Sequence, residues 1–496
     1  MFPYELGSVV MRMEQRETRR VNRFQLTAEA CTDGPFTGYV GLDRINSAAE
    51  GRPEEKMTHL MHHLNLHNLR HGFRELDGSK ASGVDQVTKL EYGKALEENI
   101  YNLCDEIQRG GWRPKPSREV LIPKPQGGTR PLAIGCLEDK IVQSVCAKIL
   151  EAIFEPAFHR HSYGFRYKRS THQAIAQLYR QIRYRADDCV VVEMDIEKFF
   201  NTIGHDKLMA VIEGRIKDQP FLRLIKRQLR NSILSVNGEI KINEVGTPQG
   251  SPISPVLANI YLNSVLDQWF EENWSERGEI VRYADDAVFV FGCEADALDF
   301  QKALTERLSV VGGLNLNMEK SGIIRFSKNN PEGDIPFLGF VIYWGRDGSK
   351  RKLLRIKTAP KRVAQCIQRF KEWIKAERHR YTTAKLWKLA ALKLQGHYNY
   401  YGVSLNRQKL HYFYHSCIML LFKWLNRRSQ KRSWTWQGFK TRLKFNQLPQ
   451  PPMESDLINI QNALGSKLKH KPKSRMRELR TYGSARSRGT QVPLFT

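Results

Sequence analysis

The tetrapeptide Tyr283-Ala284-Asp285-Asp286 places two adjacent carboxylates between two apolar segments. Apolar residues flank it throughout 280–290, a pattern typical of two strands joined by a tight turn, so we expect the acids at the tip of a hairpin. Neighbouring carboxylates repel each other and need a compensating cation, and Mg²⁺ prefers such hard oxygen ligands. An aspartate pair in an ordinary surface hairpin is the alternative that this tetrapeptide alone leaves open.

A third acid follows a segment that is typical of a buried strand. Residues 189–194 are rich in valine, and Asp195 comes directly after them, before a predicted turn and a helix over 206–216. Beside the hairpin, Asp195 would complete a site for two metal ions about 3.5–4 Å apart, an arrangement that serves nucleotidyl transfer. Glu193 shares the side-chain parity of Asp195, so we expect it behind the metal ligands. A helix-capping role is the alternative for Asp195.

Further motifs stand in a fixed order around these acids. They occupy residues 80–88, 122–132, 138–143, 162–170, 195–200, 246–262, 314–320, 337–340 and 396–402. In this order the set resembles a bacterial group II intron-encoded reverse transcriptase, also called a maturase, over residues 45–450. The last motif, Gly396-His397-Tyr398-Asn399-Tyr400-Tyr401-Gly402, resembles the maturase thumb.

The resemblance implies an α+β fold. We expect a right-hand polymerase with fingers and palm, followed by an all-α thumb (maturase X) domain and a basic tail. The expected divisions are a polar, loosely ordered extension over 1–45, a helical N-terminal fingers extension over 46–115, reverse transcriptase fingers and palm over 116–345, the helical thumb over 346–450, and a basic, nucleic-acid-binding tail over 451–496.

Local patterns supply expectations for individual helices. Leucines and methionines at helical spacing predict a helix within 53–77. Strand and helix patterns alternate over 115–345, and long helices are expected at 363–378, 383–395 and 409–425.

The resemblance also assigns the catalytic centre. It implies that Asp195, Asp285 and Asp286 are the catalytic acids, with Asp286 contributing less directly. The metal site comprises Asp195, Ile196, Asp285 and Asp286, and it would hold two Mg²⁺ ions, for which Mn²⁺ can substitute.

Four residues are expected to hold the incoming nucleotide: Lys124, Arg130, Phe200 and Gln249. The fixed positive charges of Lys124 and Arg130 suit a triphosphate. In reverse transcriptases the aromatic residue in the place of Phe200 crowds the sugar 2′-position and favours deoxynucleotides. The alternatives are an ordinary basic surface loop for the two cations and palm core for Phe200.

Contacts with primer, template or other RNA are expected from Tyr283, Arg166, Lys320, Lys431 and Arg432. Charge supports a nucleic-acid partner, because the net charge is +27. Residues 346–496 carry 35 Lys and Arg against 6 Asp and Glu, so that the first 345 residues are nearly neutral. The thumb and tail are therefore the expected contact with the phosphate backbone.

The cysteine pattern argues against a zinc-stabilised domain in this sequence. None of the 8 cysteines lies in a CxxC pair, and after Leu448 the chain has no cysteine and one histidine, His470. We therefore expect free thiols and no zinc-dependent endonuclease domain. A secretory signal and an apolar membrane span are also missing from the sequence, which predicts a bacterial cytoplasmic protein associated with the nucleoid or a ribonucleoprotein.

The expected function is that of an RNA-directed DNA polymerase which copies its intron and assists splicing. The expected partners are group II intron RNA, an RNA template with a DNA primer or target DNA, and dNTPs, without a membrane. Homodimerisation stays open. Two alternatives also stay open: a reverse transcriptase recruited for host defence or CRISPR adaptation, and a splicing-only RNA-binding maturase.

Overall fold

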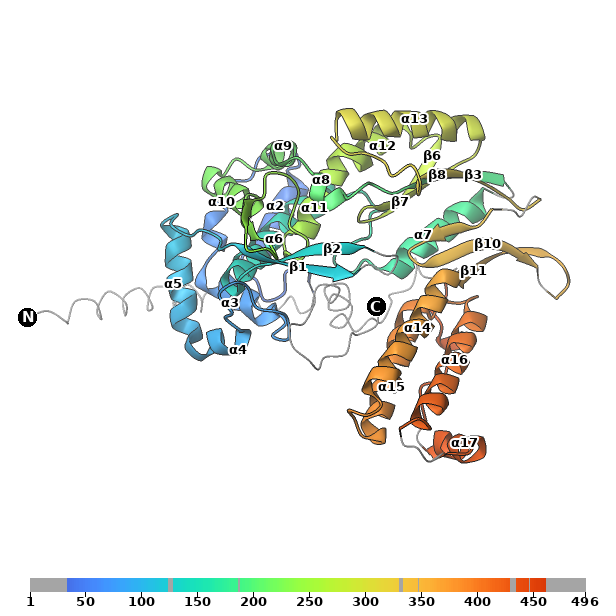
Figure 1. Cartoon of the computed structure of the whole chain (residues 1–496). Helices are drawn as coiled ribbons and strands as arrows, with labels where there is room; N and C mark the ends of the chain where they lie inside the picture. Colours follow the sequence, from blue (N-terminus) through green and yellow to red (C-terminus); the bar gives the residue numbers. More distant parts are fainter. Residues whose placement is uncertain are drawn as a thin grey trace, which may run out of the picture.

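The computed structural model describes residues 34–123, 128–185, 188–329, 333–346, 348–428, 434–445 and 447–460. Figure 1 shows a mixed helix and sheet body from which a helical bundle extends at the C-terminal end. The expected α+β fold is therefore confirmed.

The N-terminal part packs on one long buried helix, α6 (Leu137–Phe154). The helices α2 (Leu42–Gly51) and α3 (Leu66–Glu75) both contact α6, and α5 (Leu96–Gln108) packs on α3. Short helical segments lie between or after them: η1 (Met61–His63), α4 (Lys89–Tyr92), η2 (Gly93–Ala95) and η3 (Glu155–Ala157).

Two expectations for this part need correction. The helix predicted within 53–77 forms only over η1 and α3, because Met57 instead pairs with Ile216 in an isolated parallel bridge. Ordered structure also begins earlier than residue 45, since Phe36, Tyr39 and Leu42 are buried in the core. Residues 1–33 of the predicted extension lie outside the described residues.

A first sheet has the strand order β2-β1-β4-β5. It consists of β1 (Ser117–Pro123), β2 (Thr129–Ile134), β4 (Ser232–Leu234) and β5 (Ile240–Ile242). The pair β1–β2 is an antiparallel hairpin, whereas β1 and β4 run parallel. This sheet carries Arg130 and lies at the centre of Figure 1.

A second sheet, in the order β6-β7-β3-β8, carries the acidic motifs. Its strands are β6 (Gly278–Tyr283), β7 (Asp286–Phe291), β3 (Asp188–Met194) and β8 (Gly322–Ser327). Side chains alternate along β3: Val190, Val192 and Met194 join one hydrophobic cluster, whereas Cys189 and Val191 join the other. Both faces are thus covered, which explains why β3 has a continuous apolar sequence.

Helices cover the second sheet on both faces. They include α7 (Thr171–Tyr184), which contacts β6 and β7, and α13 (Glu294–Val310), which contacts β3, β7 and β8. The remaining helices of this region are α8 (Phe199–Thr202), α9 (His205–Arg215), α10 (Gln219–Leu229), α11 (Ser254–Leu262), the π-helical η4 (Asn263–Asp267) and α12 (Gln268–Asn273).

The C-terminal part joins a small sheet to a helical bundle. The sheet has the order β11-β10-β9, with β9 (Ile335–Phe337), β10 (Phe340–Arg346) and β11 (Lys352–Thr358). The helices are α14 (Pro360–Glu377), α15 (Thr383–Tyr401), α16 (Arg407–Leu425) and α17 (Trp436–Phe445), followed by η5 (Glu454–Asp456). The three predicted long helices are confirmed, and α15 extends six residues beyond its predicted end at 395.

The junction between sheet and bundle is hydrogen-bonded through Asn406. Its side chain accepts from Thr358 N at 2.8 Å and donates to Thr358 Oγ1 and to Tyr401 O, both at 2.8 Å. His172 of α7 also contacts Tyr400 O at 2.7 Å. These contacts link the bundle to the rest of the protein. No helix in the described part of the chain is long and apolar enough to cross a membrane.

His397 lies in the core of this bundle. Its ring stacks on Phe413 with centroids 3.7 Å apart, and Nε2 has no hydrogen-bond partner within the described residues. Burial lowers the pKa of His397 to about 3, so the imidazole is neutral in the folded protein.

We expect acid to destabilise the bundle through His397. The unfolded chain takes up a proton near the ordinary histidine pKa of about 6.5 and the folded protein does not, so stability is complete above that pH and falls below it. In a His397→Phe variant this dependence is lost. Between about pH 7.5 and about pH 5 the parent should lose about 2 kcal/mol relative to the variant, measured by denaturant unfolding. Parallel pH profiles for the two proteins would contradict a neutral, buried His397.

Candidate active site

The hairpin predicted at Tyr283–Asp286 is present. Tyr283 of β6 pairs with Asp286 of β7, which leaves Ala284 and Asp285 as a two-residue connection. Ala284 has φ of 58°, a left-handed conformation that a residue with a Cβ rarely adopts. A positive φ at the first connecting position belongs to the hairpin turns whose twist matches the flanking strands.

Asp195 lies beside this turn. β3 pairs with β7 up to Met194 and Ala287, so the chain reaches Asp195 next to the hairpin tip. The Asp195 backbone is fixed on its other side, where its N–H donates to Ser321 Oγ at 3.0 Å and its carbonyl accepts from Asn317 N at 2.8 Å. The expected proximity of the three acids is thus present in the structure.

Burial and neighbouring negative charge disfavour the ionised forms of Asp285, Asp286 and Glu193. Burial raises the pKa of Asp285, and the charge of Asp195 raises it further. Burial and then the charges of Asp285 and Asp195 raise the pKa of Asp286 to about 7, although its side chain keeps an exposed edge. Burial and the charge of Asp286 raise the pKa of Glu193 to about 7. The fold therefore places these carboxylates close together although their ionised forms are electrostatically unfavourable.

These residues fit divalent cations in their chemistry but do not form a closed cage. Among the residues that the structure describes, no three His, Cys, Asp or Glu side chains converge closely enough to hold a metal. The Asp195 carboxylate accepts from Lys320 Nζ at 3.1 Å, so an ammonium group compensates part of the charge. Glu193 Oε1 is buried without a partner in the described region, behind Asp286. Hard oxygen donors in mutual repulsion are the donor set that Mg²⁺ accepts.

Phe200 lies in the short helix α8 and Gln249 in a loop that contacts it. Thr247 N donates to Phe200 O at 2.6 Å, and Gln249 Nε2 donates to Asn201 Oδ1 at 3.4 Å. Gly246, with φ of 86°, makes this approach possible, because a Cβ there would lie 2.6 Å from Phe200 O. Gln249 O also accepts from Ala133 N of β2 at 2.9 Å, which ties both segments to the first sheet.

Arg130 faces the same region, since its charge lowers the pKa of Asp285 and so opposes the effect of burial. Its side chain is exposed. The structure therefore places Arg130 within electrostatic reach of Asp285, and it joins the segments of Phe200 and Gln249 to each other and to β2, the strand that carries Arg130. Lys124 lies outside the described residues, and Ile196, beside Asp195, is buried in a bridge with Leu316.

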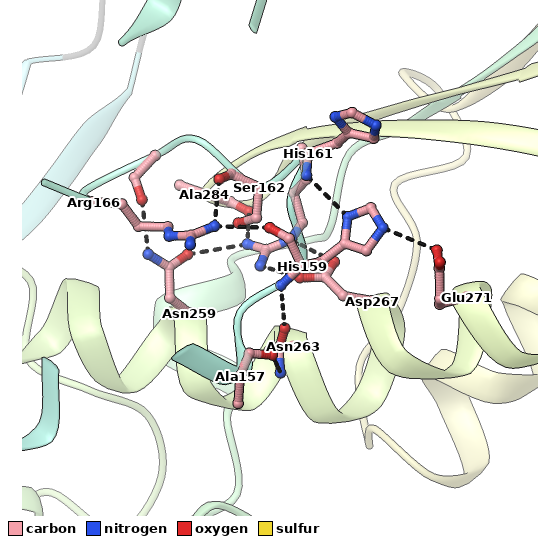
Figure 2. Close-up of polar contacts among 12 residues, drawn as sticks. Ala157, His159, His161, Ser162, Arg166, Asn259, Asn263, Asp267, Glu271 and Ala284 are labelled. Carbon is pink, nitrogen blue, oxygen red and sulfur yellow. Dashed lines mark hydrogen bonds and ion pairs between the residues drawn. The ribbon is translucent and has the colours of Figure 1, made fainter. Parts of the chain in front are cut away.

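The geometry corrects the RNA contact expected for Arg166. Its guanidinium is bound on all sides, donating to the Glu155 carboxylate and to the carbonyls of His159 at 2.7 Å and Ser162 at 2.8 Å. The side chain is 4% exposed. The motif around Arg166 does not indicate this ion pair, because Glu155 lies outside it. Instead of contacting RNA, Arg166 holds the loop that carries it (Figure 2).

The other RNA-contact residues have different environments. Lys320 is well exposed but is paired with Asp195, and Tyr283 is half-buried at the turn. Lys431 and Arg432 lie outside the described residues. RNA contact by these four residues stays a prediction.

Sequence reasoning missed the residues behind the turn. Arg282, Asn259, Asp267 and Gly164 contact the turn or each other, as Figure 2 shows for the labelled members. A signal was available, because Asn259, Asn263 and Asp267 recur every fourth residue within an otherwise apolar helix.

We expect the acidic cluster to be destabilising without metal. An Asp285→Asn substitution removes a charge next to Asp286 and Asp195, so it should raise the thermal midpoint in metal-free buffer by about 1–2 °C, the shift that corresponds to roughly 1 kcal/mol in a chain of this length. Magnesium should stabilise the parent and should stabilise the variant much less. Thermal unfolding with and without Mg²⁺ measures both effects. The matched control is Asp299→Asn on the exposed face of α13, which should behave as the parent. A variant no more stable than the parent would contradict charge repulsion at the turn.

Comparison with known proteins adds a family assignment. A family model described as reverse transcriptase (RNA-dependent DNA polymerase) matches residues 122–342, which include all the acids above. Protein YkfC of Escherichia coli is 33% identical over 282 residues, covering 50% of this chain and 73% of that protein.

Two more relatives come from introns. The group II intron-encoded protein LtrA of Lactococcus lactis is 31% identical over 226 residues, covering 45% of this chain and 37% of that protein. A 91 kDa protein in the cob intron of Schizosaccharomyces pombe is 44% identical over 220 residues, covering 43% of this chain and 24% of that protein. The match thus spans well under half the length of either intron protein. From the family model and the relative matched over most of its length, this chain belongs to the reverse transcriptase family, in the branch of group II intron-encoded reverse transcriptases and maturases.

Proposed function

We propose that this protein is an RNA-directed DNA polymerase that copies group II intron RNA into cDNA. The observation that carries the proposal is that Asp195 lies beside the Asp285–Asp286 turn at one edge of the second sheet. Burial and the charge of Asp195 raise the pKa of Asp285 and of Asp286, and Arg130 of β2 acts on Asp285 in the opposite sense. Carboxylates in such surroundings, with an arginine near them, suit the binding of metal ions and a triphosphate.

Asp195, Asp285 and Asp286, with the backbone at Ile196, would hold two Mg²⁺ ions, or Mn²⁺ in their place. When bound, such ions supply charge stabilisation for the attacking and leaving oxygens. The protein's own residues then have separate tasks. Arg130 and, by resemblance, Lys124 attract the triphosphate, whereas Lys320 holds the Asp195 carboxylate until a cation takes over its charge.

Sugar selection is assigned to Phe200. Its ring is half-buried, it packs edge-to-face on Phe199, and its backbone is fixed by the loop that carries Gln249. A fixed aromatic ring is suited to exclude a ribose 2′-hydroxyl by steric contact, since a side chain that cannot move does not make room for the added oxygen atom.

A Phe200→Ala substitution should therefore relax sugar discrimination. We expect the ratio of ribonucleotide to deoxynucleotide incorporation to rise by about tenfold or more, the range that one steric contact in a pocket supplies. Single-nucleotide primer extension with dNTP or rNTP measures the ratio. Phe199→Leu, a change in the buried neighbour, is the control for general damage to the loop. An unchanged ratio in an active Phe200→Ala enzyme would remove Phe200 from this role.

A second function, RNA binding in support of splicing, is favoured by the C-terminal bundle. Exposed basic side chains occur on all three long helices: Lys361, Lys371, Lys375, Lys385, Lys388, Arg407 and Lys423. Trp373 and Trp424 are buried and serve as bundle core, so the charges rather than these rings face solvent. Such a surface suits the phosphate backbone of a folded RNA. We propose residues 346–450 as the thumb and residues 116–345 as fingers and palm.

The direct test is primer extension on an RNA template with dNTPs and magnesium, beside an Asp285→Ala/Asp286→Ala variant. We expect full-length cDNA from the parent and none from the variant, with intron RNA binding equal in both. Equal binding is expected because the basic bundle is distant from the turn in sequence and contributes no metal ligand. Loss of RNA binding together with cDNA synthesis would argue against two separable surfaces. A parent that binds RNA but makes no cDNA would favour the splicing-only alternative.

A further inference from the structure

The helix that follows the loop of Gln249 carries a row of polar side chains. Asn259, Asn263, Asp267 and Glu271 recur every fourth residue through α11, η4 and α12, and the first three are buried. A fourth-residue spacing drifts by about 40° per step around an α-helix, so such a row would leave a single face. The wider turn of the π-helical η4 offsets that drift and keeps the row facing one side.

The row binds the loop of residues 157–164 (Figure 2). Asn263 accepts from His159 N at 3.0 Å and donates to Ala157 O at 3.1 Å, and Glu271 contacts His159 Nε2 at 3.1 Å. Asn259 donates to Gly164 O at 2.8 Å. Asn263 therefore holds the beginning of this loop, at residues 157–159, and Asn259 holds its end at Gly164.

Arg282 connects the row to the catalytic turn. It has no exposed surface; its Nε donates to Asp267 Oδ1 at 2.7 Å and its Nη2 to Asp267 Oδ2. Its Nη1 donates to Asn259 Oδ1 at 3.0 Å and to Ala284 O at 2.8 Å. We call Asn259, Asp267 and Arg282 the turn clamp. Through Arg282, the clamp hydrogen-bonds to the carbonyl of Ala284, the turn residue that has a left-handed φ.

Gly164 packs directly against the backbone of the turn. Tyr163 N donates to Arg282 O at 2.9 Å, and Arg282 N donates to His161 O at 3.0 Å, so that Ser162 forms an isolated parallel bridge with Arg282 of β6. A Cβ on Gly164 would lie 2.4 Å from Ala284 N, a distance that real side chains do not reach. Only glycine lets this loop touch the backbone of the turn.

We propose that the turn clamp, with Gly164, acts as a set of positioning residues that holds the 283–286 backbone so that Asp285 and Asp286 stay aimed at Asp195. The inference rests on the proposed function for its catalytic consequence. Two energetic costs act against this geometry of the turn. Ala284 resists its left-handed φ, and the carboxylates repel each other, so the turn relaxes away from the site unless buried contacts over-determine it.

The clamp is built for this role by its burial. A bidentate Arg–carboxylate pair without water around it has one geometry, because every donor and acceptor must be satisfied at the same time. Removing Arg282 would leave Asp267 buried without its cation, and such a variant is expected to fold poorly. Asn259 is the better residue to substitute, since the ion pair between Arg282 and Asp267 remains when Asn259 is removed.

The test compares Asn259→Ala with Asn263→Ala. Both substitutions remove a buried amide that makes two hydrogen bonds, so similar losses of thermal stability are expected. Asn263 makes both of its bonds to the loop, whereas Asn259 makes one to Gly164 O in the loop and one to Arg282. Only Asn259 touches Arg282. We expect kcat for primer extension to fall by about tenfold to hundredfold in Asn259→Ala with KM for template-primer unchanged, and to stay within about twofold in Asn263→Ala.

Hydrogen exchange supplies a readout that needs neither metal nor activity. In full-length protein, backbone exchange of a peptide spanning residues 283–287 should be faster in Asn259→Ala and in Gly164→Ala than in the parent, Asn263→Ala or Gly214→Ala. Gly214 is the control glycine, because a Cβ there meets nothing within 4 Å. Equal exchange at the turn in Asn259→Ala and Asn263→Ala would overturn the clamp. If the parent made no cDNA, the proposed function would fail while the exchange result still decided the positioning role.

Discussion

The mutual repulsion of acids at one edge of the second sheet is the constraint on which the rest of the site depends. After burial, the charge of Asp195 raises the pKa of Asp285, the charges of Asp285 and Asp195 raise the pKa of Asp286, and the charge of Asp286 raises the pKa of Glu193. A folded chain keeps such groups together only when its backbone cannot move away and when some cation is near. Arg282 meets the first condition, because it donates a hydrogen bond to Ala284 O in the turn. Lys320 meets the second, because its ammonium group is paired with Asp195.

The surrounding elements follow from that constraint. β3 is the central strand, with β7 on one side and β8 on the other, so Asp195 emerges from a part of the sheet that is paired on both edges. The hairpin tip has no such neighbours, and the loop of residues 161–164 and Arg282 take their place. The loop of Gln249 is hydrogen-bonded both to α8, which carries Phe200, and to β2, so the proposed nucleotide contacts have a rigid base.

The sequence predicted the parts that depend on local pattern. The hairpin at 283–286, the strand before Asp195 and the long C-terminal helices agree with the structure, because apolar periodicity reports burial directly. The parts that failed depend on contacts distant in the chain. Met57 was predicted to be helical but pairs with Ile216, and Arg166 was predicted to contact RNA but is buried against Glu155. Arg282 and Asp267 could not be paired from sequence, since a π-helical turn sets their register.

We propose that the carboxylates of Asp195, Asp285 and Asp286 form one divalent-metal site once substrates are present. A crystal structure of the protein with an RNA template, a DNA primer, a non-reactive dNTP analogue and Mn²⁺ would locate the ions, since Mn²⁺ is identified by its anomalous scattering. We expect two anomalous peaks bounded by Asp195 and the Asp285–Asp286 turn, with Lys320 moved off Asp195. Substrates in place with the acids free of manganese, or with Lys320 still paired to Asp195, would contradict it.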